Sequence, residues 1–157
     1  MKLMSLSRKV GKTLKNEGRA LITAESCTGG WLAQAVTSVA GSSDWFERGY
    51  VTYSNAAKRE ELGVAKSTLQ RHGAVSEATA REMARGALRG GKRALALAIT
   101  GIAGPAGGMP GKPVGTVCFA WTDGRKIRSE TRRFTGGRQS VRRQSVIHAL
   151  KGVLKWP

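Results

Sequence analysis

The sequence predicts an α/β fold, a single three-layer α/β/α domain around a mostly parallel, mixed sheet. Short apolar runs of strand length alternate with segments of helical periodicity along the chain. Near the end, Asp123-Gly124 between two alternating segments is a hairpin signal. The 157 residues contain no internal repeat and no linker, and this length suits one domain. We therefore expect residues 1–157 to form a single unit.

The N-terminal part of the chain predicts a helix followed by a buried strand. Leu6, Val10 and Leu14 recur four residues apart and Gly18 follows them, as in an amphipathic helix that ends at a glycine. Residues 20–24 then form a short apolar run that is typical of a strand covered on both faces.

A second helix and a second strand are expected next. Residues 31–40 again have helical spacing, so Ser26 falls in a turn between a strand and a helix. Residues 50–53 predict the second strand, and Asn55 can cap a helix that runs through Leu62.

Two further helices are expected before the third strand. Ser67 can cap a brief helix, and Ser76 can cap a longer one that ends before Gly90-Gly91. Residues 94–99 are almost continuously apolar, as expected of a strand with helices on both faces.

The C-terminal part predicts a glycine-rich loop, a hairpin and a closing helix. Residues 101–115 hold six glycines and form a candidate cradle for a ligand. Residues 114–121 and 126–134 alternate as strands do, which predicts an antiparallel pair. Residues 141–154 keep helical spacing to the end of the chain.

Composition argues against a membrane or secreted protein. Apolar residues make up 40% of the chain, and no apolar run approaches the roughly 20 residues that a membrane span requires. Residues 1–15 mix five basic residues with apolar ones and lack the apolar core of a secretory signal. We therefore expect a cytoplasmic protein without a membrane partner.

The cysteines and histidines do not have the spacing of a metal site. Cys27 and Cys118 lie inside expected buried elements, without the pairing pattern of a disulfide framework, so two free thiols are predicted. His72 and His148 are the only histidines, and neither HxxxH nor CxxC spacing occurs. We expect no zinc or other metal and no organic cofactor.

The formal charge of +17, from 27 basic and 10 acidic residues, raises nucleic acid or another polyanion as a partner. The basic residues are spread along the chain, and charge alone supplies only sequence-independent attraction. No specific nucleic-acid partner is therefore expected, although a basic nucleic-acid-associated protein stays an alternative function. A small anionic substrate needs just one local basic patch.

The segment AESCTGG places Ser26 at a turn from a strand into a helix. Free amides at a helix start can bind an anion or stabilise a developing oxyanion, so the turn is mechanically similar to a nucleophile elbow. The structural alternative is that Ser26 or Thr28 only caps the following helix.

Five segments in the same order resemble the CinA C-terminal family of nicotinamide-nucleotide amidohydrolases: AESCTGGWLA, GSSDWFERGYVTYSNAAK, HGAVS, TGIAGPAGG and KPVGTV. The resemblance extends over essentially the whole chain. Members of this family are Ser/Lys amidohydrolases that convert nicotinamide mononucleotide to nicotinic acid mononucleotide and ammonia in pyridine nucleotide recycling, and they commonly self-associate. The resemblance therefore implies an amidohydrolase with this substrate and a homo-oligomer.

On the matching positions, the resemblance implies Ser26 as the nucleophile and Lys58 as its base. Main-chain amides around Cys27, Thr28 and Gly29 would then hold the oxyanion. Cys27 is a rival nucleophile one position along the turn. A catalytically silent relative that binds a nucleotide stays open as an alternative function.

Tyr53, Ser54 and Asn55 precede Lys58 and could orient the base or touch the substrate. The start of the glycine-rich loop resembles the ligand loop of the family, with glycines that allow close backbone approach to ribose or phosphate: Thr100, Gly101, Ile102, Ala103, Gly104 and Pro105. Arg142 and Arg143 could pair with the substrate phosphate. The structural alternatives are a core strand residue for Tyr53, a plain connection for the loop, and a solvated helix face for the two arginines.

A lysine base needs a lowered pKa. A free lysine has a pKa of about 10.4 and is protonated at neutral pH. Lowering it to roughly 7 to 8 costs about 4 kcal/mol, which desolvation and neighbouring cations can supply. The other candidate bases are His72, Glu25 and a bound water.

Overall fold

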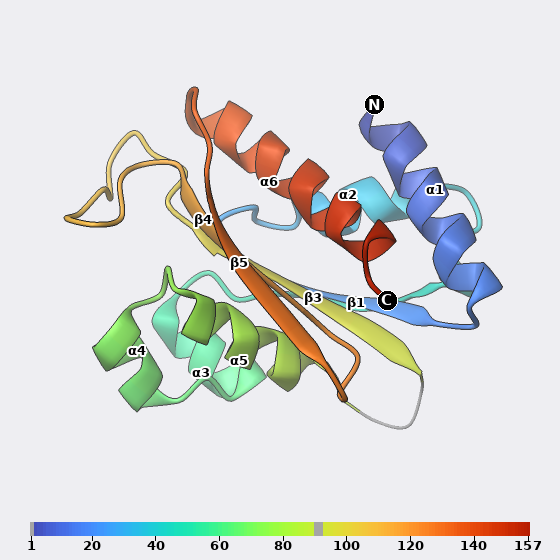
Figure 1. Cartoon of the computed structure of the whole chain (residues 1–157), viewed down its shortest axis with the longest axis horizontal. Coiled ribbons are helices and arrows are strands. Elements are labelled where there is room, and N and C mark those ends of the chain that lie inside the picture. The colour runs from blue at the N-terminus through green and yellow to red at the C-terminus, as the bar shows by residue number, and fades with distance from the viewer. Residues whose placement is uncertain (1, 90–92) are drawn as a thin grey trace.

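The computed structural model describes residues 2–89 and 93–157. Its strands form one sheet in the order β2-β1-β3-β4-β5 (Figure 1). The strands are β1 (Ala20–Glu25), β2 (Phe46–Val51), β3 (Ala94–Gly101), β4 (Thr116–Thr122) and β5 (Ile127–Arg133). β1 pairs in parallel with β2 and β3, whereas β3–β4 and β4–β5 are antiparallel. The mixed sheet and the hairpin are confirmed, with as many antiparallel as parallel pairings among the described strands.

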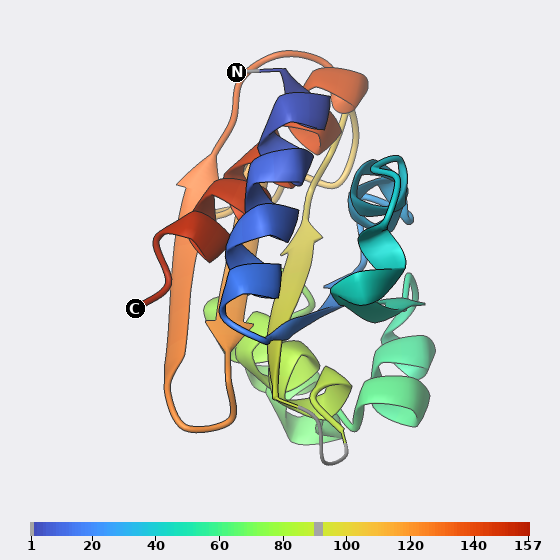
Figure 2. The ribbon, with the colours of Figure 1, turned by 90° about the vertical axis from the view of Figure 1, so that its right-hand side faces the viewer.

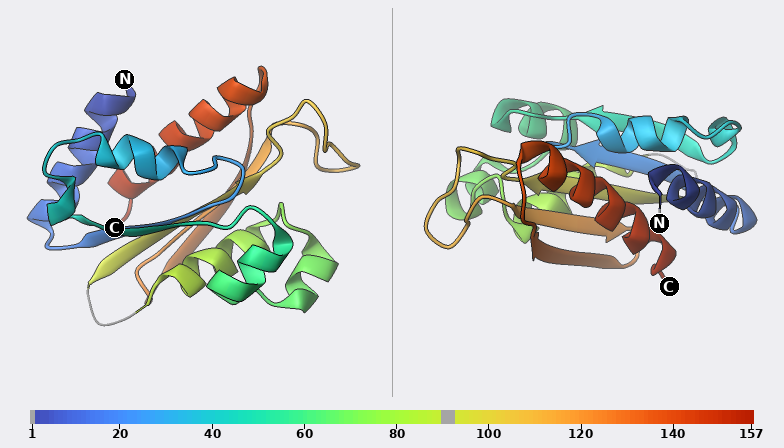
Figure 3. Two further views of the ribbon diagram at one scale, coloured as in Figure 1. Left: turned by 180° about the vertical axis from the view of Figure 1, so that it is seen from behind. Right: turned by 90° about the horizontal axis from the view of Figure 1, so that it is seen from above.

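Helices cover both faces of the sheet, which confirms the three-layer α/β/α prediction. The helices are α1 (Leu3–Asn16), α2 (Trp31–Thr37), α3 (Asn55–Leu62), α4 (Lys66–His72), α5 (Glu77–Ala87), α6 (Arg138–Leu154) and a short 3-10 turn, η1 (Ser42–Asp44). Figure 1 shows α1, α2 and α6 on one face and α3, α4 and α5 on the other. α1 packs against α6 (Figure 2), and both lie with α2 across the sheet when seen from above (Figure 3). In the described part of the chain, no helix is long and apolar enough to cross a membrane.

The central strand β3 shows why its sequence is apolar at nearly every position. Leu95, Leu97 and Ile99 belong to the core on the side of α1, α2 and α6. Ala96 and Ala98 belong to the second core, on the side of α3 and α5. Side chains alternate between the two faces of a strand, so a strand with helices on both faces is apolar throughout.

Some predicted boundaries were wrong for the second strand and helix. β2 begins at Phe46, not near residue 50, because it pairs with β1 from the register Leu21↔Phe46 onward. α2 stops at Thr37 instead of residue 40. There the Ser38 hydroxyl donates to Ala35 O, the carbonyl that a longer helix would offer to Val39 N, and Val39 N donates to Val36 O instead.

Two predicted helix caps were also wrong. Ser54, not Asn55, caps α3, because its side chain accepts a hydrogen bond from Ala57 N. α4 begins at Lys66, and its cap residue is Ala65, not Ser67. The N–H of Ala65 donates to the carboxylate of Glu82 in α5, so a side chain from another helix accepts a hydrogen bond at the start of α4. Ser76 caps α5 as predicted. The expected end at Gly90-Gly91 lies outside the described residues.

The topology brings three loops together at one edge of the sheet. β1, β2 and β3 are mutually parallel, so their carboxyl ends share this edge. The chain leaves β1 for α2 on one face and leaves β2 for α3 on the other (Figure 3). A crevice outside the strand ends at such a switch point is the usual ligand site of an open α/β sheet. Ser26 and Tyr53 follow β1 and β2 there.

α5 approaches α3, the helix that carries Lys58, so closely that Gly86 has no room for a side chain. A Cβ atom at Gly86 would lie 1.7 Å from the backbone oxygen of Leu62, the last residue of α3.

We expect Gly86→Ala to lower the free energy of unfolding by about 3 kcal/mol, because the two helices must separate to admit the methyl group. Helix propensity alone would raise it by about 1 kcal/mol. Urea denaturation measures the difference. A variant more stable than the wild type would show that the close approach of α3 and α5 is not a constraint on the fold.

Candidate active site

The structure brings Ser26 and Lys58 into direct contact. Lys58 Nζ lies 2.9 Å from Ser26 Oγ, although the two residues are 32 positions apart in the chain. Ser26 stands just after β1, and Lys58 lies one turn into α3. Both are buried, with 7% of Ser26 and 1% of Lys58 exposed. A hydroxyl and an amine at this distance form a nucleophile–base pair if the amine is neutral.

Lys58 is buried, and its Nζ faces main-chain carbonyls. Besides Ser26 Oγ, its Nζ donates to Thr52 O at 3.1 Å and to Tyr53 O at 2.9 Å. Burial lowers the pKa of Lys58 from its ordinary value, because the charged form loses its hydration. The direction agrees with what a lysine base requires.

Two local features hold Lys58 in this position. The Ser54 side chain caps α3, and the N–H of Lys58 donates to Ser54 O, which places the lysine in the first turn of the helix. The N–H of Thr52 donates to Glu25 O, which ties the end of β2 to the end of β1. This hydrogen bond fixes the backbone at Thr52, whose carbonyl, with that of the next residue, Tyr53, faces Lys58 Nζ.

The Ser26 turn is tight and leaves three amides without a main-chain carbonyl partner. Ser26 N donates to Ile99 O of β3, and Gly29 N donates to Ser26 O. Gly29 and the cap residue of α2, Gly30, have φ values of 58° and 101°, which only glycine adopts readily. In the described residues, the N–H groups of Cys27, Thr28 and Gly30 donate to no main-chain carbonyl. Gly29 is therefore not a free donor, contrary to its inclusion among the expected oxyanion amides.

The Glu25 carboxylate is engaged at the start of α2 and forms no hydrogen bond with Ser26 Oγ in the described residues. The carboxylate is completely buried and accepts hydrogen bonds from Thr28 Oγ1 at 2.7 Å, Leu32 N at 2.8 Å and Ala33 N at 3.0 Å. Both of its oxygens are thus engaged at the start of α2. Thr28 does not cap that helix alone, because its hydroxyl donates to the Glu25 carboxylate.

Cys27 is poorly suited as the nucleophile. Burial raises the pKa of its thiol to about 12, so the thiol is neutral at physiological pH. Cys27 and Cys118 are both buried and free, as predicted.

The two arginines of α6 are not equivalent. Arg142 lies against the Ser26 turn, where its Nε donates to Cys27 O at 3.1 Å and its terminal nitrogen to Thr28 O at 3.0 Å. The guanidinium also lies over the Trp31 ring, 5.4 Å from its centroid. The side chain of Arg143 is exposed and has no hydrogen bond or ion pair with the described part of the chain. The structure therefore brings Arg142 to the site and leaves Arg143 outside it.

The predicted substrate residues of the β2–α3 connection differ in environment. Tyr53 is 60% exposed and is not a core strand residue. Its hydroxyl accepts a hydrogen bond from Arg138 at 3.1 Å. Ser54 is engaged as the cap of α3, and Asn55 is exposed at the first position of that helix.

The glycine-rich loop begins at the carboxyl end of β3, at the same edge of the sheet as Ser26. Thr100 is buried and donates to Ala74 O at 2.8 Å, within the HGAVS segment. The next residues, Gly101, Ile102, Ala103 and Gly104, are largely buried, whereas Pro105 is exposed. Gly104 has a φ of 85° and its carbonyl accepts from Arg138 at 2.7 Å.

Arg138 is a further candidate site residue, which was not predicted from the sequence. Its guanidinium links Tyr53, after β2, to Gly104, after β3. The spacing held a signal, because residues four apart share one face of a helix and Arg138 stands four positions before Arg142.

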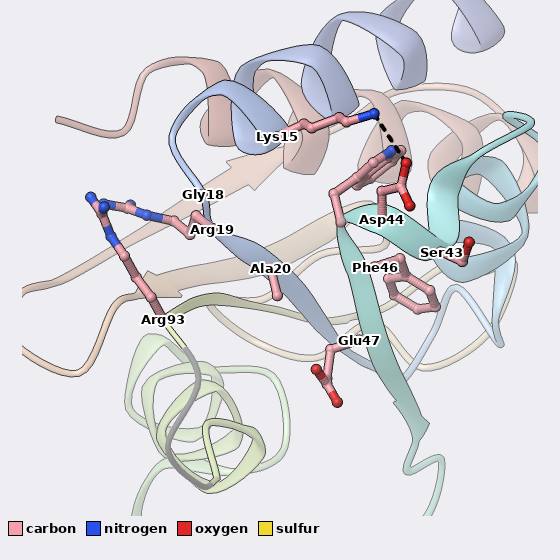
Figure 4. A pocket seen from close by; sticks show the side chains of 10 residues that line it. Lys15, Gly18, Arg19, Ala20, Ser43, Asp44, Phe46, Glu47 and Arg93 are labelled. Atoms are coloured by element: carbon pink, nitrogen blue, oxygen red, sulfur yellow. Dashed lines mark hydrogen bonds and ion pairs between the residues drawn. The ribbon is translucent and has the colours of Figure 1, made fainter.

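A separate cavity lies at the opposite edge of the sheet (Figure 4). Its volume is about 330 Å3, and its lining includes Arg19 and Arg93, which precede β1 and β3. Across it, Lys15 Nζ forms an ion pair with Asp44 Oδ2 at 3.0 Å. This cavity is therefore at the amino ends of the strands, whereas Ser26 and Lys58 lie at the carboxyl ends.

Comparison with known proteins gives one consistent assignment. The family model of the CinA C-terminal domain matches residues 3–156. The chain is 54% identical to the nicotinamide-nucleotide amidohydrolase PncC of Escherichia coli strain K12, over 95% of this chain and 91% of that protein. It is 50% identical to the protein of that name from Pseudomonas putida, over 98% and 96%. The crystal structure of the competence/damage inducible protein CihA from Agrobacterium tumefaciens matches with a TM-score of 0.92 at 43% identity, over 98% of this chain and 94% of that one. The chain belongs to the family of the CinA C-terminal domain.

Proposed function

We propose that this protein hydrolyses the carboxamide of nicotinamide mononucleotide to nicotinic acid mononucleotide and ammonia, with Ser26 as nucleophile and Lys58 as general base. The observation that carries the proposal is the buried Lys58 Nζ at 2.9 Å from Ser26 Oγ. The substrate is inferred from relatives of 50% identity or more that carry the name nicotinamide-nucleotide amidohydrolase. We also propose that the protein acts in pyridine nucleotide recycling, that it is cytoplasmic and that it forms a homo-oligomer.

The carbonyls around Lys58 suit the neutral amine that the mechanism needs. A neutral amine has two N–H donors and one lone pair. Thr52 O and Tyr53 O can accept the two N–H groups, which directs the lone pair at the Ser26 hydroxyl. Burial favours the neutral form, so a larger fraction of Lys58 is unprotonated at a given pH than of an exposed lysine.

In the first half of the reaction, Ser26 Oγ attacks the carboxamide carbon while Lys58 Nζ takes the hydroxyl proton. The same proton passes to the amide nitrogen, the C–N bond breaks and ammonia leaves an acyl ester on Ser26. In the second half, Lys58 takes a proton from water, which attacks the ester carbon. Ser26 Oγ departs and recovers that proton, so the enzyme returns to its starting state.

The oxyanion of each tetrahedral intermediate is assigned to the amides of Cys27 and Thr28. The Cys27 carbonyl accepts from Arg142. In a trans peptide the N–H of the next residue points the opposite way, so the Thr28 N–H is directed away from Arg142. We assign the nucleotide part of the substrate to Tyr53, Arg138 and the loop from Thr100 to Pro105, which meet at the same edge of the sheet.

Ser26→Ala should lower ammonia release from nicotinamide mononucleotide by about 10⁴-fold or more, because no acyl ester can form. Far-ultraviolet circular dichroism should be unchanged, since only a hydroxyl is removed. Cys27→Ala is the matched control and should keep most of the activity, because the Cys27 thiol is neutral. The nucleophile assignment is abandoned if Ser26→Ala keeps near-wild-type turnover, and a thiol mechanism replaces it if Cys27→Ala alone is inactive.

The pH profile tests Lys58 as the base. Because only the neutral amine accepts a proton, kcat/KM should rise with pH through the lowered pKa of Lys58 in the free enzyme, and fall as the pH drops below it. Lys58→Arg should be nearly inactive, since arginine keeps the charge but stays protonated.

Lys66→Arg makes the same exchange at an exposed position of α4 and should leave kcat/KM unchanged. Wild-type kcat in Lys58→Arg would reduce Lys58 to an electrostatic contact. The base would then have to be another group.

A further inference from the structure

The Ser26 turn is held from two sides by side chains of opposite charge. We propose that Glu25 and Arg142 are positioning residues that fix the orientation of the Cys27–Thr28 peptide, so that the Thr28 N–H faces the oxyanion. This inference rests on the proposed function of Ser26 as the nucleophile. Neither side chain takes part in proton transfer, and each acts through main-chain groups or through Thr28.

Glu25 holds the helix side of the turn. The cap residue of α2 is Gly30, which offers no side chain to the first amides of the helix. The Glu25 carboxylate, which comes from the end of β1, accepts from Leu32 N and Ala33 N in its place. It also accepts from the Thr28 hydroxyl at 2.7 Å, so the strand, the turn and the helix share one buried acceptor.

Arg142 holds the carbonyl side of the turn. Its two hydrogen bonds go to consecutive carbonyls, Cys27 O and Thr28 O. A planar guanidinium with a fixed fork of donors suits this paired arrangement, which a lysine cannot reproduce. The ring of Trp31 lies under the guanidinium and restricts its position further.

The turn needs both contacts because its own backbone is permissive. Gly29 and Gly30 both have positive φ, so the chain after Thr28 can change direction at low cost. A rotation of the Cys27–Thr28 peptide would exchange the directions of its carbonyl and its N–H. Arg142 fixes where the carbonyl points, and Glu25 fixes the Thr28 side chain and the start of α2. With both groups fixed, the Thr28 N–H keeps a single orientation and has no main-chain carbonyl partner.

The experiment compares each positioning residue with a matched residue elsewhere. Arg142→Met and Glu25→Gln should each lower kcat by about 10²-fold, the usual effect of losing one oxyanion donor, while KM for nicotinamide mononucleotide changes little. Arg143→Met removes the neighbouring exposed arginine and should leave kcat unchanged. Glu82→Gln removes a carboxylate that accepts from Ala65 N and the Thr68 hydroxyl at the start of α4, so it should cost stability without lowering kcat.

Two further variants keep the test decisive. Because Glu25 is completely buried, Glu25→Gln can fail to fold; Thr28→Val, which removes one of its three donors, then takes its place and should show a smaller fall in kcat at constant KM. Arg142→Lys should recover less than a tenth of wild-type kcat, because one ammonium cannot bond both carbonyls in the same geometry. Full recovery by Arg142→Lys contradicts the paired-carbonyl role.

The rival role for Arg142 is a contact with the substrate phosphate, and the nucleoside without that phosphate separates the two. A phosphate contact predicts a raised KM for the nucleotide and no effect of Arg142→Met on the nucleoside. The positioning role predicts the same fractional loss of turnover on both. If Ser26→Ala is inactive while Arg142→Met and the folded Glu25 or Thr28 variant keep wild-type kcat, the positioning proposal fails and the nucleophile stands. An active Ser26→Ala removes the proposed function itself.

Discussion

The contact between the Lys58 amine and the Ser26 hydroxyl is the interaction on which the arrangement of this protein depends. A lysine kept out of water has a lowered pKa, and that shift requires burial among groups that do not stabilise the charge fully. Burying an amine costs free energy, so the rest of the fold must be stable enough to tolerate it. The two cores on either side of the sheet supply that stability, and β3 contributes to both of them.

The parallel part of the sheet makes the contact geometrically possible. Ser26 and the carbonyls of Thr52 and Tyr53 follow neighbouring parallel strands, so their backbones are placed by the hydrogen bonds of the sheet rather than by flexible loops. The antiparallel strands β4 and β5 take no direct part in the pair. They extend the sheet and support α6, which delivers Arg142 and Arg138 to the same edge.

Some of the many basic residues of the chain form hydrogen bonds at this edge of the sheet. Lys58, Arg138 and Arg142 all donate to main-chain carbonyls, which belong to the loops that follow β1, β2 and β3. Basic side chains thus link the loops that follow β1, β2 and β3. Arg138 and Arg142 also carry positive charge at this edge, which attracts anions whatever their sequence.

By itself the sequence determined the fold class, the order of the strands and helices along the chain, the hairpin and the two residues, Ser26 and Lys58, that the structure brings into contact. Apolar periodicity reports which face of a helix or strand is buried, and glycine positions report local backbone conformation, so both can be recognised from residues that are close in sequence. The resemblance of its motifs singled out Ser26 and Lys58, which the structure joins across 32 residues. Other features depended on contacts between distant segments. The register with β1 set the start of β2, and Glu82 set the start of α4. Glu25 accepts hydrogen bonds from amides of a helix that begins six residues later. Arg142 differs from Arg143 because of the face of α6 that meets the Ser26 turn. These features depend on three-dimensional packing, because no local pattern in the sequence specifies which distant group will complete a given hydrogen bond.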